Sequence, residues 1–122
     1  MVIGLGRFGG AVSRTLERMG HEVLAVDIDP ALVQEFAGEL TKVVEADATD
    51  TTTLEQLGAK DFDAAVVGIG TNIEASVLIV LALSDLGLTN IWAKATNEKH
   101  ARILERTGAA HVVFPEQRMG ER

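Results

Sequence analysis

Short apolar segments alternate with longer amphipathic segments along the whole chain. The apolar segments cover residues 1–4, 22–27, 42–46, 64–68, 90–95 and 111–114, and their apolar positions are nearly continuous rather than alternating. Strands that are covered on both faces have this pattern, because neither side of such a strand meets water. We therefore predict six buried β-strands.

The segments between the predicted strands have the spacing of amphipathic helices and carry helix boundary signals. Helices are predicted over residues 9–19, 30–40, 51–57, 72–86 and 97–106. Pro30 occupies a first-turn position directly after Asp29, which we expect to cap that helix. Asn97 is expected to cap the last helix, with His100 at its third position. Glycines follow several of the helix ends, as they do in C-terminal caps.

Strands and helices in strict alternation predict parallel strands joined by helical crossovers. The expected fold class is α/β: a Rossmann fold with a doubly wound parallel sheet of six strands in the order 3-2-1-4-5-6. Ligands of such folds bind at the carboxyl ends of the strands, near the point where the strand order reverses. The candidate functional residues are therefore those that directly follow the predicted strands.

Composition narrows the classes of function. The chain has 122 residues, of which 47% are hydrophobic, so we expect one domain with a substantial core. The formal net charge is −7 and no basic stripe interrupts the acidic balance, so no nucleic-acid partner is expected. The absence of Cys excludes disulfides, thiolate catalysis and cysteine-bound metal. The most apolar run, residues 77–83, is too short to span a bilayer.

The segment after the first predicted strand is the strongest candidate for chemistry. Gly4, Gly6 and Gly9 match the pattern G-x-G-x-x-G, in which glycines permit a tight turn, a close approach to phosphate and close helix–strand packing. The N-terminus of the following helix would offer N–H groups and partial positive charge to an anion. Within this turn lie Arg7, which would reach the phosphate or point outward to a partner, and Phe8.

Asp27 ends the second predicted strand, followed by Ile28. In dinucleotide-binding folds a carboxylate at this position accepts hydrogen bonds from the ribose hydroxyls. We predict this role for Asp27; the alternative is that it only caps the next helix, which we assign to Asp29. An acid here repels a 2′-phosphate and no Arg follows directly, so NADP is not favoured.

Two loops after the third and fourth predicted strands are further candidates: Asp47, Ala48, Thr49, Gly68, Ile69 and Gly70, the last three followed in the same loop by Thr71 and Asn72. The first loop would border the adenine or form only a helix-capping turn. The second loop lies across the reversal point from the glycine turn, where it would face the ligand or form an ordinary connection.

Lys94 lies near the end of an otherwise apolar predicted strand. A buried lysine is costly without an anion, so Lys94 would bind a phosphate or a carboxylate, or would extend to the edge of the sheet. His21, His100 and His111 have no metal-binding spacing, and each is expected at the surface or at a strand end. No residues have the spacing of a catalytic set, so we do not expect an enzyme.

Several stretches of the sequence resemble the RCK, or TrkA-N, domains that regulate potassium channels and transporters. They are VIGLGRFGG (residues 2–10), MGHEVLAVD (19–27), GIGTNIEAS (68–76), NIWAKA (90–95), FPE (114–116) and MG (119–120). The resemblance covers essentially the whole chain and extends in particular to the cytosolic subunits of Ktr-type bacterial potassium uptake systems.

This resemblance implies a cytoplasmic regulatory subunit that binds ATP or ADP, with NAD(H) as a further ligand. Such subunits form homodimers that assemble into a ring, and they attach to the inner membrane through a potassium channel or transporter subunit, which the ligand gates. The resemblance places the nucleotide at these residues: Gly4, Gly6, Arg7, Gly9, Asp27, Asp47, Ala48, Thr49 and Lys94.

The resemblance also implies roles for two charged residues. Arg7 would reach toward the terminal phosphate, either in its own subunit or in the neighbouring one. Glu116 would help to hold a cation, Mg²⁺, Ca²⁺ or Na⁺, between the nucleotides of a dimer. From the sequence alone, Glu116 would instead be a first-turn acid that stabilises a helix dipole.

We expect residues 1–115 to form the nucleotide-binding RCK N-terminal domain and residues 116–122 to begin a crossover helix. The second, smaller regulatory domain of family members is expected to be absent from these 122 residues. Two other functions stay open: the cofactor-binding domain of an NAD-dependent oxidoreductase, and the regulatory domain of a potassium efflux system. The oxidoreductase would need a substrate domain and a proton donor, for which the chain has no room.

Overall fold

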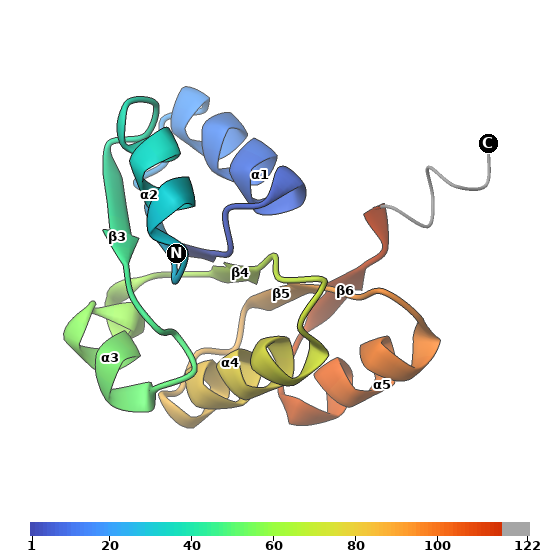
Figure 1. Cartoon of the computed structure of the whole chain (residues 1–122). Coiled ribbons are helices and arrows are strands. Elements are labelled where there is room, and N and C mark those ends of the chain that lie inside the picture. The colour runs from blue at the N-terminus through green and yellow to red at the C-terminus, as the bar shows by residue number, and fades with distance from the viewer. Residues whose placement is uncertain (116–122) are drawn as a thin grey trace.

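A computed structural model describes residues 1–115 as strands and helices in alternation (Figure 1). The described strands are β1 (Val2–Ile3), β2 (Leu24–Asp27), β3 (Lys42–Glu45), β4 (Ala65–Val67), β5 (Ile91–Lys94) and β6 (His111–Val113). The described helices are α1 (Arg7–Arg18), α2 (Pro30–Ala37), α3 (Thr51–Gln56), α4 (Ile73–Asp85) and α5 (Glu98–Thr107), with a 3-10 turn at Ala59–Asp61. The crossover helix expected from residue 116 lies outside the described residues.

The strands form one parallel sheet in the order β3-β2-β1-β4-β5-β6, which confirms the predicted Rossmann fold. The strand order reverses between β1 and β4. Helices α1 and α2 lie on one face of the sheet, and α3, α4 and α5 lie on the other (Figure 1). The larger core cluster includes Ile3, Val67, Ile79 and Leu83, because β1 and β4 are central and α4 is buried along the sheet.

Most α-helices in the described residues begin at a side-chain cap. The caps of α2 to α5, each accepting a backbone N–H two or three residues ahead at 2.8–3.0 Å, are Asp29, Asp50, Asn72 and Asn97. The predicted caps Asp29 and Asn97 are thereby confirmed. Helix α1 differs, because its N-cap is Gly6, which has no side chain to accept a hydrogen bond.

Helix α1 begins at Arg7, so the predicted start at residue 9 is wrong. The glycine pattern suggested a turn that reaches Gly9, but Arg7 and Phe8 are already helical, and Gly9 and Gly10 are small for reasons of packing. A Cβ on Gly9 would overlap the carbonyl oxygen of Gly4, and a Cβ on Gly10 would lie 2.6 Å from the Phe36 ring. The predicted packing role of Gly9 is confirmed.

We predict that Gly9→Ala lowers the free energy of unfolding by about 3 kcal/mol or more, because the backbone of Gly4 must move away to admit the methyl group. The matched control is Gly6→Ala in the same turn, where a Cβ would meet no atom within 4 Å. There we expect a loss of about 1 kcal/mol or less, from the poorer N-cap. Urea denaturation of both variants measures the difference; equal midpoints would contradict the packing argument.

Candidate functional site

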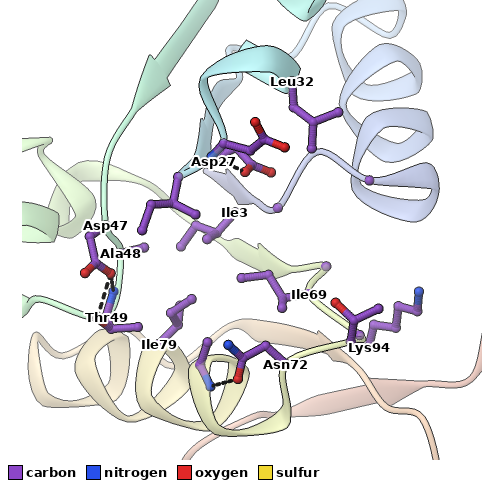
Figure 2. A pocket seen from close by; sticks show the side chains of 18 of the residues that line it. Ile3, Asp27, Leu32, Asp47, Ala48, Thr49, Ile69, Asn72, Ile79 and Lys94 are labelled. Carbon is purple, nitrogen blue, oxygen red and sulfur yellow. Dashed lines mark hydrogen bonds between the residues drawn. The ribbon is translucent and has the colours of Figure 1, made fainter.

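A cleft of about 720 Å³ opens at the carboxyl ends of the strands, where the strand order reverses. Figure 2 shows Asp27 on the side of the cleft nearest α1 and α2, and Ile79 and Asn72 on the side formed by α4. The cleft is lined by most of the predicted site residues: Gly4, Gly6, Arg7, Asp27, Ile28, Asp47, Ala48, Thr49, Gly68, Ile69, Gly70 and Lys94. The structure therefore brings together segments that are far apart in the sequence.

Three predicted residues are not part of this lining. Phe8 is half-buried on α1 and is not among the residues that line the cleft. Gly9 is buried behind the turn, where it packs against the backbone of Gly4, the residue after β1. Glu116 lies outside the described residues.

Sequence reasoning missed the apolar walls of the cleft and some of its polar rim. The additional lining residues are Ile3, Asp29, Leu32, Ala46, Glu74, Ala75, Leu78 and Ile79, whereas Thr71 and Asn72 belong to the predicted loop after β4. The apolar ones have the same pattern as ordinary core residues, so only their position beside the strand ends distinguishes them. Ile28 and Leu78 are 63% and 43% exposed, which gives the cleft an apolar surface suited to a flat ring.

Helix α1 presents an uncapped N-terminus to the cleft. Its first intrahelical bond runs from the Gly10 N–H to the Gly6 carbonyl at 2.8 Å, so the preceding N–H groups have no acceptor within the helix. The space in front of Gly6 is open, since a Cβ there would meet nothing within 4 Å. N–H groups without an acceptor and the positive end of the helix dipole are the features that favour an anion at a helix N-terminus.

The Asp27 carboxylate fixes the glycine turn to the end of β2. Its Oδ2 accepts the Leu5 N–H at 2.7 Å, and its Oδ1 accepts the Asp29 N–H at 2.8 Å. Asp29, and not Asp27, caps α2, so the capping alternative for Asp27 is wrong. Each carboxylate oxygen has a second lone pair that can accept a further hydrogen bond from a ligand in the cleft.

Asp47 and Thr49 form a local turn at the opposite wall. The Asp47 Oδ1 accepts the Thr49 hydroxyl at 2.6 Å and the Thr49 N–H at 3.0 Å. These two bonds, the hydroxyl first, hold the pKa of the Asp47 carboxyl below its usual value. Because Asp50 caps α3, the alternative of a helix-capping role for Asp47 is also wrong.

Lys94 lies at the end of β5 and is 8% exposed, so it does not extend to the solvent at the sheet edge as one alternative proposed. It packs against the loop that follows β4. A Cβ on Gly70 would lie 2.9 Å from both Cε and Nζ of Lys94, so glycine at this position leaves room for the lysine. Lys94 is thus a buried cation at the wall of the cleft (Figure 2).

The expectation that all three histidines lie at the surface or at strand ends is wrong for His100. His21 is exposed, and His111 is exposed on β6, where its ring stacks on Trp92. His100 is 1% exposed and hydrogen-bonded on both ring nitrogens. A single histidine on a helix has no sequence pattern that separates a buried partner from a surface residue.

Within residues 1–115, no group of three or more His, Cys, Asp or Glu residues is arranged to hold a metal ion. In the same part of the chain, no helix is long and apolar enough to cross a membrane.

Residues 1–115 match the family model of the TrkA-N domain. The chain belongs to this family. It is 49% identical over 119 residues to Ktr system potassium uptake protein A, and 46% identical over 121 residues to Ktr system potassium uptake protein C, both of Bacillus subtilis strain 168. These matches cover 98% and 99% of this chain but 54% and 55% of the relatives. The chain thus spans about half the length of the curated relatives it matches.

Solved structures of other proteins share the fold. The TrkA-N domain of the inner membrane protein ybaL from Escherichia coli has a TM-score of 0.85 at 17% identity, covering 98% of this chain and 89% of that one. The GsuK channel bound to NAD has a TM-score of 0.80 at 19% identity, covering 92% and 20%. The Shewanella denitrificans Kef CTD in AMP-bound form has a TM-score of 0.76 at 30% identity, covering 93% and 69%.

The names of the two Bacillus subtilis relatives describe potassium uptake rather than a chemical reaction, in agreement with the expectation that this domain is not an enzyme.

The turn at Asp47 yields a direct test of the electrostatics of the cleft wall. We predict that Thr49→Val raises the pKa of the Asp47 carboxyl toward its usual value, because the hydroxyl is the largest cause of the lowering. The pKa stays partly lowered, since the Thr49 N–H still donates. NMR titration of the carboxyl carbon measures the shift, with Thr52→Val as the control that leaves it unchanged. An unaltered Asp47 pKa in Thr49→Val would refute the assigned turn.

Proposed function

We propose that the chain is the nucleotide-binding domain of a regulatory subunit of a Ktr-type potassium uptake system. ATP or ADP occupies the cleft, and the exchange of one for the other changes the state of the membrane transporter subunit. The names of the relatives at 49% and 46% identity support potassium uptake as the process. The cleft supports a nucleotide as the signal.

The observation that carries the nucleotide is the uncapped N-terminus of α1 beside the Asp27 carboxylate in one cleft. A helix N-terminus favours phosphate, and a carboxylate at the end of β2 favours ribose hydroxyls. The exposed Ile28 side chain offers an apolar surface for the adenine, and residues 47–49 offer a polar edge. The cleft thus contains a complementary group for each part of an adenosine phosphate.

The chemistry of the cleft favours some adenine nucleotides over others. AMP in the Kef structure, at 30% identity, supports recognition of the adenosine phosphate that ATP, ADP and NAD(H) share. Asp27 and Asp29 put negative charge at the end of β2, where it repels a 2′-phosphate, so NADP(H) is disfavoured. NAD(H) remains an alternative ligand because it has a free 2′-hydroxyl.

A ligand can select one state of a protein only through contacts that another ligand lacks. Arg7 is the first residue of α1, exposed at the cleft, and is the residue we propose to contact the terminal phosphate.

The subunit is proposed to form homodimers that assemble into a ring on the cytoplasmic side of the membrane, docked on the transporter subunit. Glu116 and a cation, Mg²⁺, Ca²⁺ or Na⁺, would bridge the two nucleotides of a dimer.

The two alternative functions have less support. The two Bacillus subtilis relatives are named as potassium uptake proteins rather than oxidoreductases, so the oxidoreductase alternative has no support from them. A regulatory domain of an efflux system would share this fold, but the two Bacillus subtilis relatives named above are potassium uptake proteins.

The ribose contact is tested by a double-mutant cycle in which the second change is made in the ligand. We predict that wild-type protein binds 2′-deoxy-ADP about tenfold more weakly than ADP, because a hydrogen bond to a charged group is lost. In Asp27→Ala the two nucleotides bind alike, although both bind more weakly, since Asp27 also holds the Leu5 and Asp29 N–H groups. Calorimetry gives the four dissociation constants. Equal ADP and 2′-deoxy-ADP affinities in the wild type would contradict the ribose role, and failure to bind ADP or ATP would overturn the proposed function.

Reading of the terminal phosphate is tested at Arg7. We expect Arg7→Gln to weaken ATP binding by about tenfold with little effect on AMP, because one charge-assisted contact is lost. Arg14→Gln is the control, as Arg14 lies on the same helix but pairs with Glu39 at 3.0 Å. Affinities for ATP and AMP that fall equally in Arg7→Gln would show that Arg7 does not distinguish the nucleotides.

A further inference from the structure

His100 is a buried histidine between two helices and a strand end. It is the third residue of α5 and is 1% exposed. Its Nδ1 lies 3.1 Å from the Thr96 backbone nitrogen, and its Nε2 lies 2.7 Å from the hydroxyl of Ser76 on α4. The Ser76 hydroxyl in turn lies 2.9 Å from the carbonyl oxygen of Ile73.

These contacts define one tautomer. A backbone N–H can only donate, so Nδ1 of His100 accepts from Thr96. The ring proton is then on Nε2 and is donated to the Ser76 hydroxyl, which donates its own proton to the Ile73 carbonyl. Every group in this chain of hydrogen bonds has a partner only while the His100 ring is neutral.

Both ends of this hydrogen-bond network, Ile73 and Thr96, adjoin segments that line the cleft. Ile73 begins α4 and follows the loop of residues 68–72, which lines the cleft. Thr96 comes two residues after Lys94, which lines the cleft from β5. In front, Gly70 of the same loop packs on the Lys94 side chain. His100 therefore holds together the two segments that form one wall of the cleft.

We propose that neutral His100 is a positioning residue that fixes the loop of residues 68–72 against the end of β5, and that its protonation loosens this wall and weakens nucleotide binding. The inference rests on the proposed function, since it assigns a pH response to the same cleft.

The geometry determines the direction of the response. A proton on Nδ1 would face the Thr96 N–H, so two donors would oppose each other. Burial lowers the pKa of His100 below its usual value of 6.5, so the ring stays neutral at neutral pH. Because the folded-state pKa is depressed, stability is complete above the ordinary histidine pKa and decreases as the pH falls below it.

No carboxylate in residues 1–115 hydrogen-bonds or pairs with the His100 ring to stabilise its charged form. The titratable and charged residues on its own helix and on the elements packed against it are Glu74, Asp85, Lys94, Glu98, Lys99, Arg102, Glu105, Arg106 and His111. All of these side chains except Lys94 belong to exposed residues.

The test compares ADP affinity in the wild type and His100→Gln between about pH 8 and about pH 5.5. A glutamine carbonyl accepts from Thr96 and its amide donates to Ser76, without titrating. We expect similar affinities at the higher pH and a wild-type affinity about tenfold below that of the variant at the lower pH. The ADP phosphate titrates in the same way in both measurements, so its effect cancels in the ratio of the wild-type affinity to the variant affinity at each pH. Parallel profiles would overturn the proposal, whereas absence of ADP binding at the higher pH would overturn the proposed function instead.

A second measurement needs no variant. Linkage requires that if protonation of His100 weakens ADP binding, then ADP binding lowers the pKa of His100. NMR titration of the His100 ring with and without saturating ADP tests this, with the exposed His21 ring as the internal control. A His100 pKa that is unchanged by ADP would refute the positioning role. If His100 had a purely structural role, its pKa would likewise be the same with and without ADP.

Discussion

The close contact between helix α1 and the centre of the sheet is the constraint on which the cleft depends. Gly9 on the helix contacts the backbone of Gly4 on one side, and a Cβ on Gly68 would lie only 3.2 Å from the Gly9 Cα. Three glycines thus allow the first turn of α1 to begin directly above the ends of β1 and β4. If the helix were held farther away, its N–H groups would not face the point where the strand order reverses.

Polar groups at the rim hold the remaining walls in place around that helix. Asp27 accepts two backbone N–H groups, from the glycine turn and from the residue before α2. His100 links the start of α4 to the end of β5 through Thr96 and Ser76. Among the described residues, no buried side-chain nitrogen or oxygen lacks a hydrogen-bond partner. Hydrogen bonds within the protein thus connect the segments that form the walls of the cleft.

The sequence was sufficient to predict the strand order and most of the cleft, because both follow from local signals. The alternation of apolar and amphipathic segments determines the parallel sheet, and residues such as Asp27 and Thr49 lie directly after strands. The start of α1 was misplaced because the G-x-G-x-x-G pattern suggested a turn that reaches Gly9, whereas Arg7 and Phe8 already belong to the helix. His100 was misjudged because its environment is built from Ser76 and Thr96, a contact that no local pattern encodes. The apolar residues of the cleft walls were missed because their sequence pattern is that of ordinary core residues, and only the fold shows that they lie beside the strand ends.

The most direct test of the central claim is an NMR titration of ¹⁵N-labelled protein with ADP. The account predicts that the backbone amides of Arg7 and Phe8 shift strongly, because they lie at the uncapped start of α1. Amides in the segments around Asp27, Thr49 and Gly70 shift with the same dissociation constant, since these segments line one cleft. Shifts confined to other parts of the sheet, or no shifts at all, would contradict the assignment of this cleft as a nucleotide site.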